Sequence, residues 1–211
     1  MSTAPDRRSR KRQATQQLIS DAATRLFLER GFDHVTVDEI AAAADVGRMT
    51  VFNHFPRKED MFFDRDEEGR ERLREALRQR GGVAPVEALR RLAHTLVEER
   101  SPYLEFSAAS RGFIETIEAS ATLLARARAI RDELAQEIMA ALCEAVGREP
   151  GDAAAHLAAH LLLATWTVAF VQAHRTFRQK RSSKEASALF LALVDKGSLG
   201  LQAAMAGTPY A

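Results

Sequence analysis

The ten residues VGRMTVFNHF, at positions 46–55, combine side chains that form directional hydrogen bonds with large apolar ones. Arg48, Thr50 and Asn53 carry hydrogen-bond donors or acceptors, and Met49 adds a long flexible thioether. With 3.6 residues per turn, this order of residues gives a helix one apolar and one polar face. An apolar face packs into a core and leaves the polar face for a partner. The segment therefore predicts a short recognition helix.

Double-stranded DNA is the partner that these residue types fit. The major groove admits one α-helix, and each base pair displays its own pattern of donors and acceptors there. An arginine pairs with guanine through two hydrogen bonds, and threonine or methionine packs against a thymine methyl group. Basic and polar groups at helix ends and in a nearby basic segment suit phosphate. The predicted DNA contacts are Thr36, Arg48, Met49, Thr50, Asn53, His54, Lys58, Arg10 and Arg12.

Three of these residues also have purely structural interpretations. Thr36 is followed three residues later by Glu39, a pattern that caps the start of a helix. His54 is compatible with a capping or core histidine, and Lys58 with a solvated helix start. The case for DNA rests on all these residues lying in register.

The composition predicts an all-α protein that can position such a motif. Hydrophobic residues make up 46% of the 211 residues and charged residues 28%, with few glycines and prolines. Helical spacing, capping patterns and breaks at Gly31, Pro56 and Gly81–Gly82 give about nine helices. They are expected at 12–30, 37–44, 48–54, 58–80, 85–100, 108–119, 122–146, 152–179 and 183–206.

Charge is concentrated at the start of a chain whose formal net charge is only +1. Five basic residues precede position 13, against one acid, Asp6. Such a segment suits phosphate contact, although a solubilising tail has the same composition. We expect residues 1–11 to form a basic flexible arm, 12–57 a helix-turn-helix domain, 58–206 a second helical domain and 207–211 a tail.

The motif resembles the TetR family of transcriptional regulators. The matching run is VTVDEIAAAADVGRMTVFNHFPRKEDM, preceded by LFLERGF, and the resemblance covers about residues 12 to 62. Asp45 stands where the family usually has a turn glycine, Gly47 where a capping serine is common, and Phe52 where tyrosine is usual. Aspartate tolerates the left-handed backbone of such a turn. Glycine is an acceptable cap without a side-chain bond.

The resemblance implies a repressor that binds a palindromic operator as a homodimer and responds to a small ligand. The second half would then hold the ligand and the dimer interface, and the fourth helix would link it to the DNA-binding domain. We expect the last two long helices to form the interface through a four-helix arrangement. Its expected members are Leu162, Ala169, Ala173, Leu189, Leu193 and Leu201, although these residues could also pack inside one chain.

Aromatic and polar residues of the second half suggest a pocket for a hydrophobic or aromatic ligand. The candidates are His94, Tyr103, Phe113, His160, Trp166 and Phe170. His156 and His160 have the spacing of a metal-binding pair, but no third ligand is evident. We therefore expect no metal and no cofactor.

Two other functional classes compete with a ligand-responsive regulator. A nucleoid-type DNA-binding protein would need only the first sixty residues, which leaves about 150 residues unexplained. A helical-bundle enzyme would need a nucleophile with a base, paired carboxylates or metal ligands, and no such set is evident. The one cysteine, Cys143, lies in an apolar helical pattern, and the N-terminus lacks the apolar segment of a signal peptide. We expect a cytoplasmic protein whose apolar stretch at 157–171 forms a core or interface helix rather than a membrane span.

Overall fold

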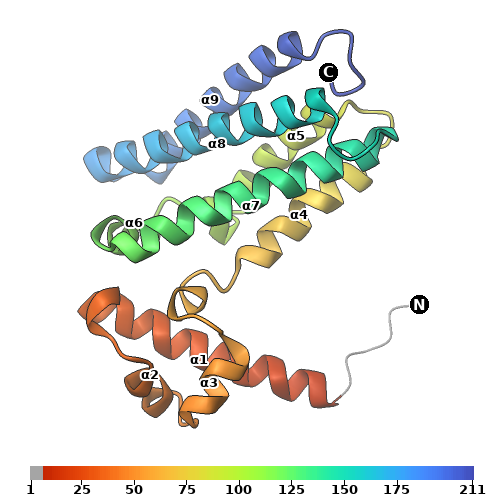
Figure 1. Cartoon of the computed structure of the whole chain (residues 1–211). Helices are drawn as coiled ribbons and strands as arrows, with labels where there is room; N and C mark the ends of the chain where they lie inside the picture. Colours follow the sequence, from red (N-terminus) through yellow and green to blue (C-terminus); the bar gives the residue numbers. More distant parts are fainter. Residues whose placement is uncertain (1–6) are drawn as a thin grey trace. The chain divides into compact units, whose positions relative to one another are not determined.

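The computed structural model describes residues 7–211, apart from the side chains of Asp66 and Tyr103, and this part of the chain is helical throughout, without a strand (Figure 1). The helices are α1 (Arg7–Arg30), α2 (Val37–Ala43), α3 (Arg48–His54), α4 (Asp66–Arg78), α5 (Pro85–Glu98), α6 (Ala108–Ala119), α7 (Ala121–Val146), α8 (Ala153–Lys180) and α9 (Ser183–Ala204). Short 3-10 turns lie at Phe32–His34, Lys58–Met61 and Pro102–Leu104. The all-α class is confirmed.

The chain divides into two compact units, and each is described by itself. The first comprises the described residues up to Asp66 together with Gly112–Arg126, and the second Glu67–Arg111 with Ala127–Ala211. The sequence placed the boundary at position 57 and gave the first unit no later segment. Leu123 explains the addition of Gly112–Arg126, because it is fully buried in the core that α1, α2 and α3 share.

The core of the first unit consists of side chains that α1, α2 and α3 direct inward. Phe27, Ile40 and Val51 are fully buried, one from each helix. Phe27 lies 4.9 Å from Phe32, measured between ring centroids. The apolar stripe of each helix therefore meets the other two, which fixes the polar face of α3 outward.

The expected continuous helix from Lys58 to Arg80 is wrong. A 3-10 turn covers Lys58–Met61, and α4 begins only at Asp66. Met61 and Phe62 are both buried, and Phe62 stacks on Phe113 with ring centroids 4.3 Å apart. The Ser20 hydroxyl donates to the carbonyl of Met61 and to the Asp64 carboxylate. Burial of consecutive side chains and capture of a carbonyl by Ser20 favour a turn over helix.

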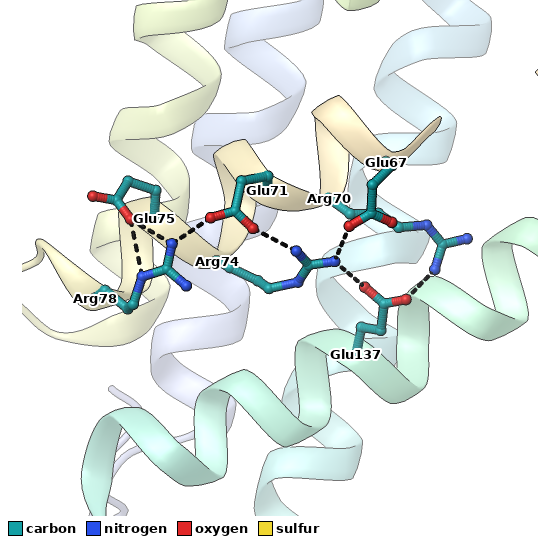
Figure 2. A network of polar contacts seen from close by, with 7 residues as sticks. All are labelled: Glu67, Arg70, Glu71, Arg74, Glu75, Arg78 and Glu137. Carbon is teal, nitrogen blue, oxygen red and sulfur yellow. Dashed lines mark hydrogen bonds and ion pairs between the residues drawn. The ribbon is translucent and has the colours of Figure 1, made fainter. Parts of the chain in front are cut away.

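The second unit is built around the long helices α8 and α9, which pack side by side (Figure 1). Helix α5 packs against α9, and an ion-pair ladder joins α4 to α7 (Figure 2). Leu162, Ala169, Ala173 and Leu201 are buried within the single chain. These four residues therefore belong to the chain's own core, which was the alternative to the expected interface. Leu189 and Leu193 on α9 are half-buried.

The expected tail at 207–211 folds back onto the second unit. Tyr210 is fully buried, and its carbonyl accepts a hydrogen bond of 3.3 Å from the backbone nitrogen of Val86. Thr208 donates from its backbone nitrogen to the carbonyl of Met205 at 2.9 Å. The segment contributes a large aromatic side chain to the core, which its short polar sequence did not suggest.

Candidate DNA-binding site

The start of α2 is fixed by a complete capping box. Thr36 Oγ1 accepts from the backbone nitrogen of Glu39, and both the backbone nitrogen and hydroxyl of Thr36 donate to Glu39 Oε2 at 2.8 Å. The backbone bond from Thr36, followed by its hydroxyl bond, lowers the pKa of the Glu39 carboxyl. The cap proposed for Thr36 from the sequence is confirmed, and its hydroxyl proton is already used.

The turn between α2 and α3 depends on one left-handed residue. Asp45 has a φ of 51°, in the left-handed region that aspartate tolerates in place of the usual turn glycine. The backbone nitrogen of Val46 then returns to the carbonyl of Ala41 at 3.0 Å, which closes α2. Gly47 caps α3 without a side-chain bond. The two helices are thus joined by a tight turn of defined geometry.

Helix α3 has the two faces that its sequence predicts. Val51 is fully buried and Phe55 is 3% exposed, so these two anchor the helix in the core. Met49 is 71% exposed, and Arg48 and Asn53 are exposed as well. Thr50 is half-buried. The exposed set forms one surface that extends from the first turn to near the end of a helix that follows a tight turn.

Arg48 is held by a contact that the sequence analysis did not include. Its Nη1 atom donates to both carboxylate oxygens of Asp38, at 3.1 and 2.8 Å. The guanidinium also lies over the ring of Phe52, 5.6 Å from its centroid. Asp38 lies ten positions earlier, on α2, so only the geometry of the turn brings the pair together.

Lys58 faces its own domain. Its ammonium donates to the carbonyls of Phe32 and Val35 at 2.8 and 2.9 Å, and it lies 4.1 Å from the centroid of the Phe32 ring. Burial lowers the pKa of this ammonium, opposed by the nearby carboxylate of Asp33. The expected phosphate ligand thus acts first as a cap for backbone carbonyls.

The three remaining predicted DNA contacts differ in exposure: one is half-buried and two are exposed. His54 is half-buried, and its Nδ1 is buried without a hydrogen-bond partner among the described residues. Arg10 and Arg12 are exposed on the first turns of α1. Residues 7–11 are therefore helical rather than a flexible arm, because Arg, Lys and Gln favour helix and no glycine or proline interrupts them. Residues 1–6 of the expected arm lie outside the described residues.

Comparisons with known proteins agree with this geometry. The family model described as bacterial regulatory proteins, tetR family, matches residues 19–64. NalD of Pseudomonas aeruginosa, the secondary repressor of the MexAB-OprM multidrug efflux pump, has the same fold, with a TM-score of 0.58. The match covers 88% of this chain and 97% of NalD at 22% identity. Residues 19–64 therefore match the N-terminal domain of the tetR family.

Two further similar proteins show which part of the chain is alike in sequence and which part is alike in fold. The transcriptional regulator TcmR of Streptomyces glaucescens is 40% identical over 57 residues, which span 27% of this chain and 25% of TcmR. The TetR-family repressor FadR of Thermus thermophilus, solved in complex with lauroyl-CoA, gives a TM-score of 0.56 at 24% identity. That match covers 88% of this chain and 92% of FadR. Sequence similarity is thus concentrated in the DNA-binding domain, and the remainder is similar in fold.

The six predicted ligand residues lie on several different elements. Phe113 stacks on Phe62 in the first unit. His160 is exposed on α8, and His94 lies on α5, where its Nε2 is 2.8 Å from Asp195 Oδ1. The side chain of Tyr103 lies outside the described part of the structure. These candidates thus have different neighbours, because one-dimensional spacing does not report how helices cross.

Trp166 and Phe170 belong to one aromatic cluster, linked through Phe190 and Phe106, that the sequence did not fully predict. Phe170 contacts the ring of His174, with 4.4 Å between centroids, and His174 lies 5.0 Å from Phe106. Trp166 packs edge-on against Phe190 at 6.1 Å, and its Nε1 is buried without a hydrogen-bond partner in the described chain. His174 lies seven residues after Thr167, a spacing that places both on the same face of a helix. Phe106 and Phe190 lie on other segments, so no spacing along α8 could have indicated them.

Proposed function

We propose that this chain is a homodimeric, sequence-specific DNA-binding transcriptional regulator, a repressor that a small hydrophobic or aromatic ligand releases from its operator. The observation that carries the proposal is α3. Its apolar residues are anchored in the core while Arg48, Met49 and Asn53 project from its other side. A helix that follows a tight turn, is buried on one side and exposes hydrogen-bonding side chains on the other has the form of a major-groove reader. A protein acting on bacterial DNA would work in the cytoplasm.

The contacts to DNA separate into base reading and phosphate binding. Arg48, Met49, Thr50 and Asn53 are proposed to face base edges, because they occupy the exposed side of α3. Arg10, Arg12 and His54 are proposed to bind phosphates. Thr36 and Lys58 support this surface through their caps, and any phosphate contact they make is secondary to that role.

The dimer is proposed to form through the exposed apolar face of α8. Leu157, Leu161, Val168 and Val171 are 36–53% exposed and follow helical spacing along one side of the helix. This helix is long and apolar enough to span a membrane by composition alone, yet only 28% of its most apolar window is buried in the chain. His156 and His160 interrupt the same face, so a second protein copy fits it better than lipid does. Leu199, 67% exposed on α9, extends the surface.

The ligand is proposed to reach the aromatic cluster around Trp166, Phe170 and His174. The cluster offers ring faces and one buried indole donor, the composition expected for an apolar ligand with a polar group. FadR, similar in fold, is solved with lauroyl-CoA, whose acyl chain belongs to this chemical class. Ligand binding is coupled to DNA release if the ligand favours one of two arrangements of the protein.

The experiment is DNA binding by fluorescence anisotropy across a salt series. Duplexes are the DNA upstream of the protein's own gene, a sequence selected from a random pool, and a shuffled control. Arg48→Ala should lose affinity for the selected duplex by about 1–3 kcal/mol with little change on shuffled DNA. Arg12→Ala should weaken both alike and reduce the salt slope by about 1. Arg148→Ala, exposed in the turn before α8, is the control and should match wild type. Equal affinity of wild type for all duplexes would overturn the proposal.

Ligand response separates this function from its two competitors. Lauroyl-CoA, CoA alone and a panel of aromatic compounds are titrated into the complex of protein and selected duplex. Release by an apolar compound but not by CoA supports the regulator. Tight binding that no compound releases favours the ligand-independent DNA-binding protein, and chemical turnover of a compound favours an enzyme.

A further inference from the structure

We propose that Asp38, on α2, is a positioning residue that aims the Arg48 guanidinium at a guanine edge. The inference rests on the proposed function and assigns base specificity within it. Both side chains are well exposed, at 64% for Asp38 and 60% for Arg48, so the pair lies on the surface that the recognition helix presents. No contact of Asp38 with DNA is needed.

The contact uses one corner of the guanidinium and leaves the rest available. Both hydrogen bonds to Asp38 come from Nη1, at 3.1 and 2.8 Å. Within the described chain, Nε and Nη2 of Arg48 make no hydrogen bond to another residue. An arginine has five donors in a rigid plane, and guanine needs two of them for its N7 and O6 acceptors. Asp38 therefore orients Arg48 without blocking it.

The ring of Phe52 restricts the same group from a second direction. The guanidinium carbon lies over this ring, 5.6 Å from its centroid, while the carboxylate holds an edge. A carboxylate at an edge and a ring at a face fix both the position and the tilt of the plane. Because a free arginine loses rotamer entropy when it is ordered, ordering before DNA arrives lowers the cost of binding.

Asp38 also lowers the attraction of Arg48 for phosphate. A guanidinium beside a carboxylate carries little net charge toward the DNA backbone, and the carboxylate itself repels phosphates. Pairing with guanine survives this neutralisation, since it depends on directed hydrogen bonds. The pair is therefore expected to raise discrimination between sequences more than total affinity.

The competing interpretation is that the ion pair only joins α2 to α3. Exposed pairs of this kind contribute little to stability, and the turn already has the backbone bond from Val46 to Ala41. A structural role would change the melting temperature and would act whether or not Arg48 were present. A positioning role acts only through Arg48, which makes the two separable.

The test uses Asp38→Asn, which keeps the size of the side chain and removes its charge. Affinities for the selected and shuffled duplexes are measured at fixed salt for wild type, Asp38→Asn, Arg48→Ala and the double variant. Asp45→Asn is the matched control: it removes a charge from the same surface, its left-handed backbone suits asparagine, and its side chain makes no hydrogen bond to another described residue. Each guanine of the selected duplex is also replaced in turn by 7-deazaguanine, which lacks the N7 acceptor.

Asp38→Asn is expected to lower the ratio of selected to shuffled affinity about tenfold, with no change in melting temperature. Asp45→Asn should leave the ratio unchanged, and Asp38→Asn should add no further loss to Arg48→Ala. Replacement of one particular guanine by 7-deazaguanine should weaken binding of the wild-type protein. The same replacement should leave the affinities of Asp38→Asn and Arg48→Ala unchanged.

Two results would overturn this inference and leave the proposed function standing. One is a ratio of selected to shuffled affinity in Asp38→Asn that equals the wild-type ratio. The other is a loss of that ratio on adding Asp38→Asn to Arg48→Ala that equals the loss in wild type. Wild-type protein that fails to distinguish the selected duplex from the shuffled one would instead overturn the proposed function, and the inference with it.

Discussion

At the scale of single residues, Gly197 decides how closely α8 and α9 approach. A Cβ atom built at Gly197 would lie 2.2 Å from Cγ2 and 2.6 Å from Oγ1 of Thr165. Thr165 is β-branched and has few rotamers into which it could retreat. The absence of a side chain at this position is therefore a condition for the observed crossing of the two helices.

Gly197→Ala should lower the free energy of unfolding by about 1–3 kcal/mol, because the new methyl group overlaps Thr165. Gly200→Ala, three residues along the same helix, meets nothing within 4 Å and should raise stability by about 0.5–1 kcal/mol. Urea denaturation of both variants checks the pair. Equal effects of the two substitutions would show that helix propensity and not close packing governs α9.

At the scale of elements, a ladder of alternating charges joins α4 to α7 (Figure 2). Arg74 donates hydrogen bonds to Glu67 and Glu71 on its own helix and to Glu137 on α7. These bonds raise the pKa of Arg74, and the bond to Glu67 contributes most. Arg70, 6% exposed, binds Glu133 at 3.1 Å and Glu137 on α7. A buried arginine between two carboxylates fixes the register of the two helices, since a shift would leave its charge without a partner.

Arg70→Met should cost about 1–3 kcal/mol of unfolding free energy, a moderate loss because the two glutamates it leaves behind are partly exposed and can hydrate. Arg78→Ala, at the exposed end of the ladder, should cost less than Arg70→Met, because solvent screens its ion pairs. Denaturation in low and high salt measures both. A larger loss for Arg78→Ala would contradict the assignment of Arg70 as the central group.

A second ion-pair cluster, on α5, predicts a pH dependence. A hydrogen bond from Arg90 lowers the pKa of Glu87 from 4.5 to about 2, with a smaller contribution from Arg91. A depressed carboxyl pKa stabilises the fold above about pH 4.5, and that stability is lost as the pH falls toward about 2.

Glu87→Gln should therefore destabilise the protein by about 1–2 kcal/mol at pH 7, and the difference from wild type should vanish as the pH approaches 2. Denaturant titrations at several pH values give the curve. Glu98→Gln, on the same helix but exposed and without a hydrogen bond to another described residue, should give no such dependence. A constant difference across this pH range would exclude the ion pair as its cause.

Local sequence rules predicted elements well and failed where distant segments meet. Thr36 with Glu39, Gly31 and Pro85 set helix ends correctly because each acts on its own neighbours. The turn after Lys58 was missed, since it depends on Ser20 forty-one positions away from Met61. The Arg48–Asp38 pair and the placement of His94 beside Asp195 likewise arise from how helices cross.

At the scale of the whole molecule, α8 leaves a continuous apolar face that the chain itself does not cover. Spacing predicted that the helix would be apolar, but the residues chosen for the interface lie on its inner side. An amphipathic pattern cannot distinguish the two sides when both are apolar, and only the packing of α9 determines which one is covered.

Val168→Asp, 53% exposed on this face, should convert a dimer of twice 23.3 kDa into a monomer in sedimentation at micromolar concentration. Leu18→Asp, similarly exposed but on α1, should remain dimeric. Loss of the dimer in both variants, or in neither, would contradict the proposed interface. The monomer should also bind its operator more weakly, because each copy presents a single reading helix.

The burial of Tyr210 bears on how the protein can be trimmed. Its ring is enclosed and its carbonyl is bonded to Val86, whereas Gly207, Pro209 and Ala211 beside it are exposed. A truncation meant to improve crystals should therefore keep Tyr210, because its loss would leave a cavity in the core of the second unit.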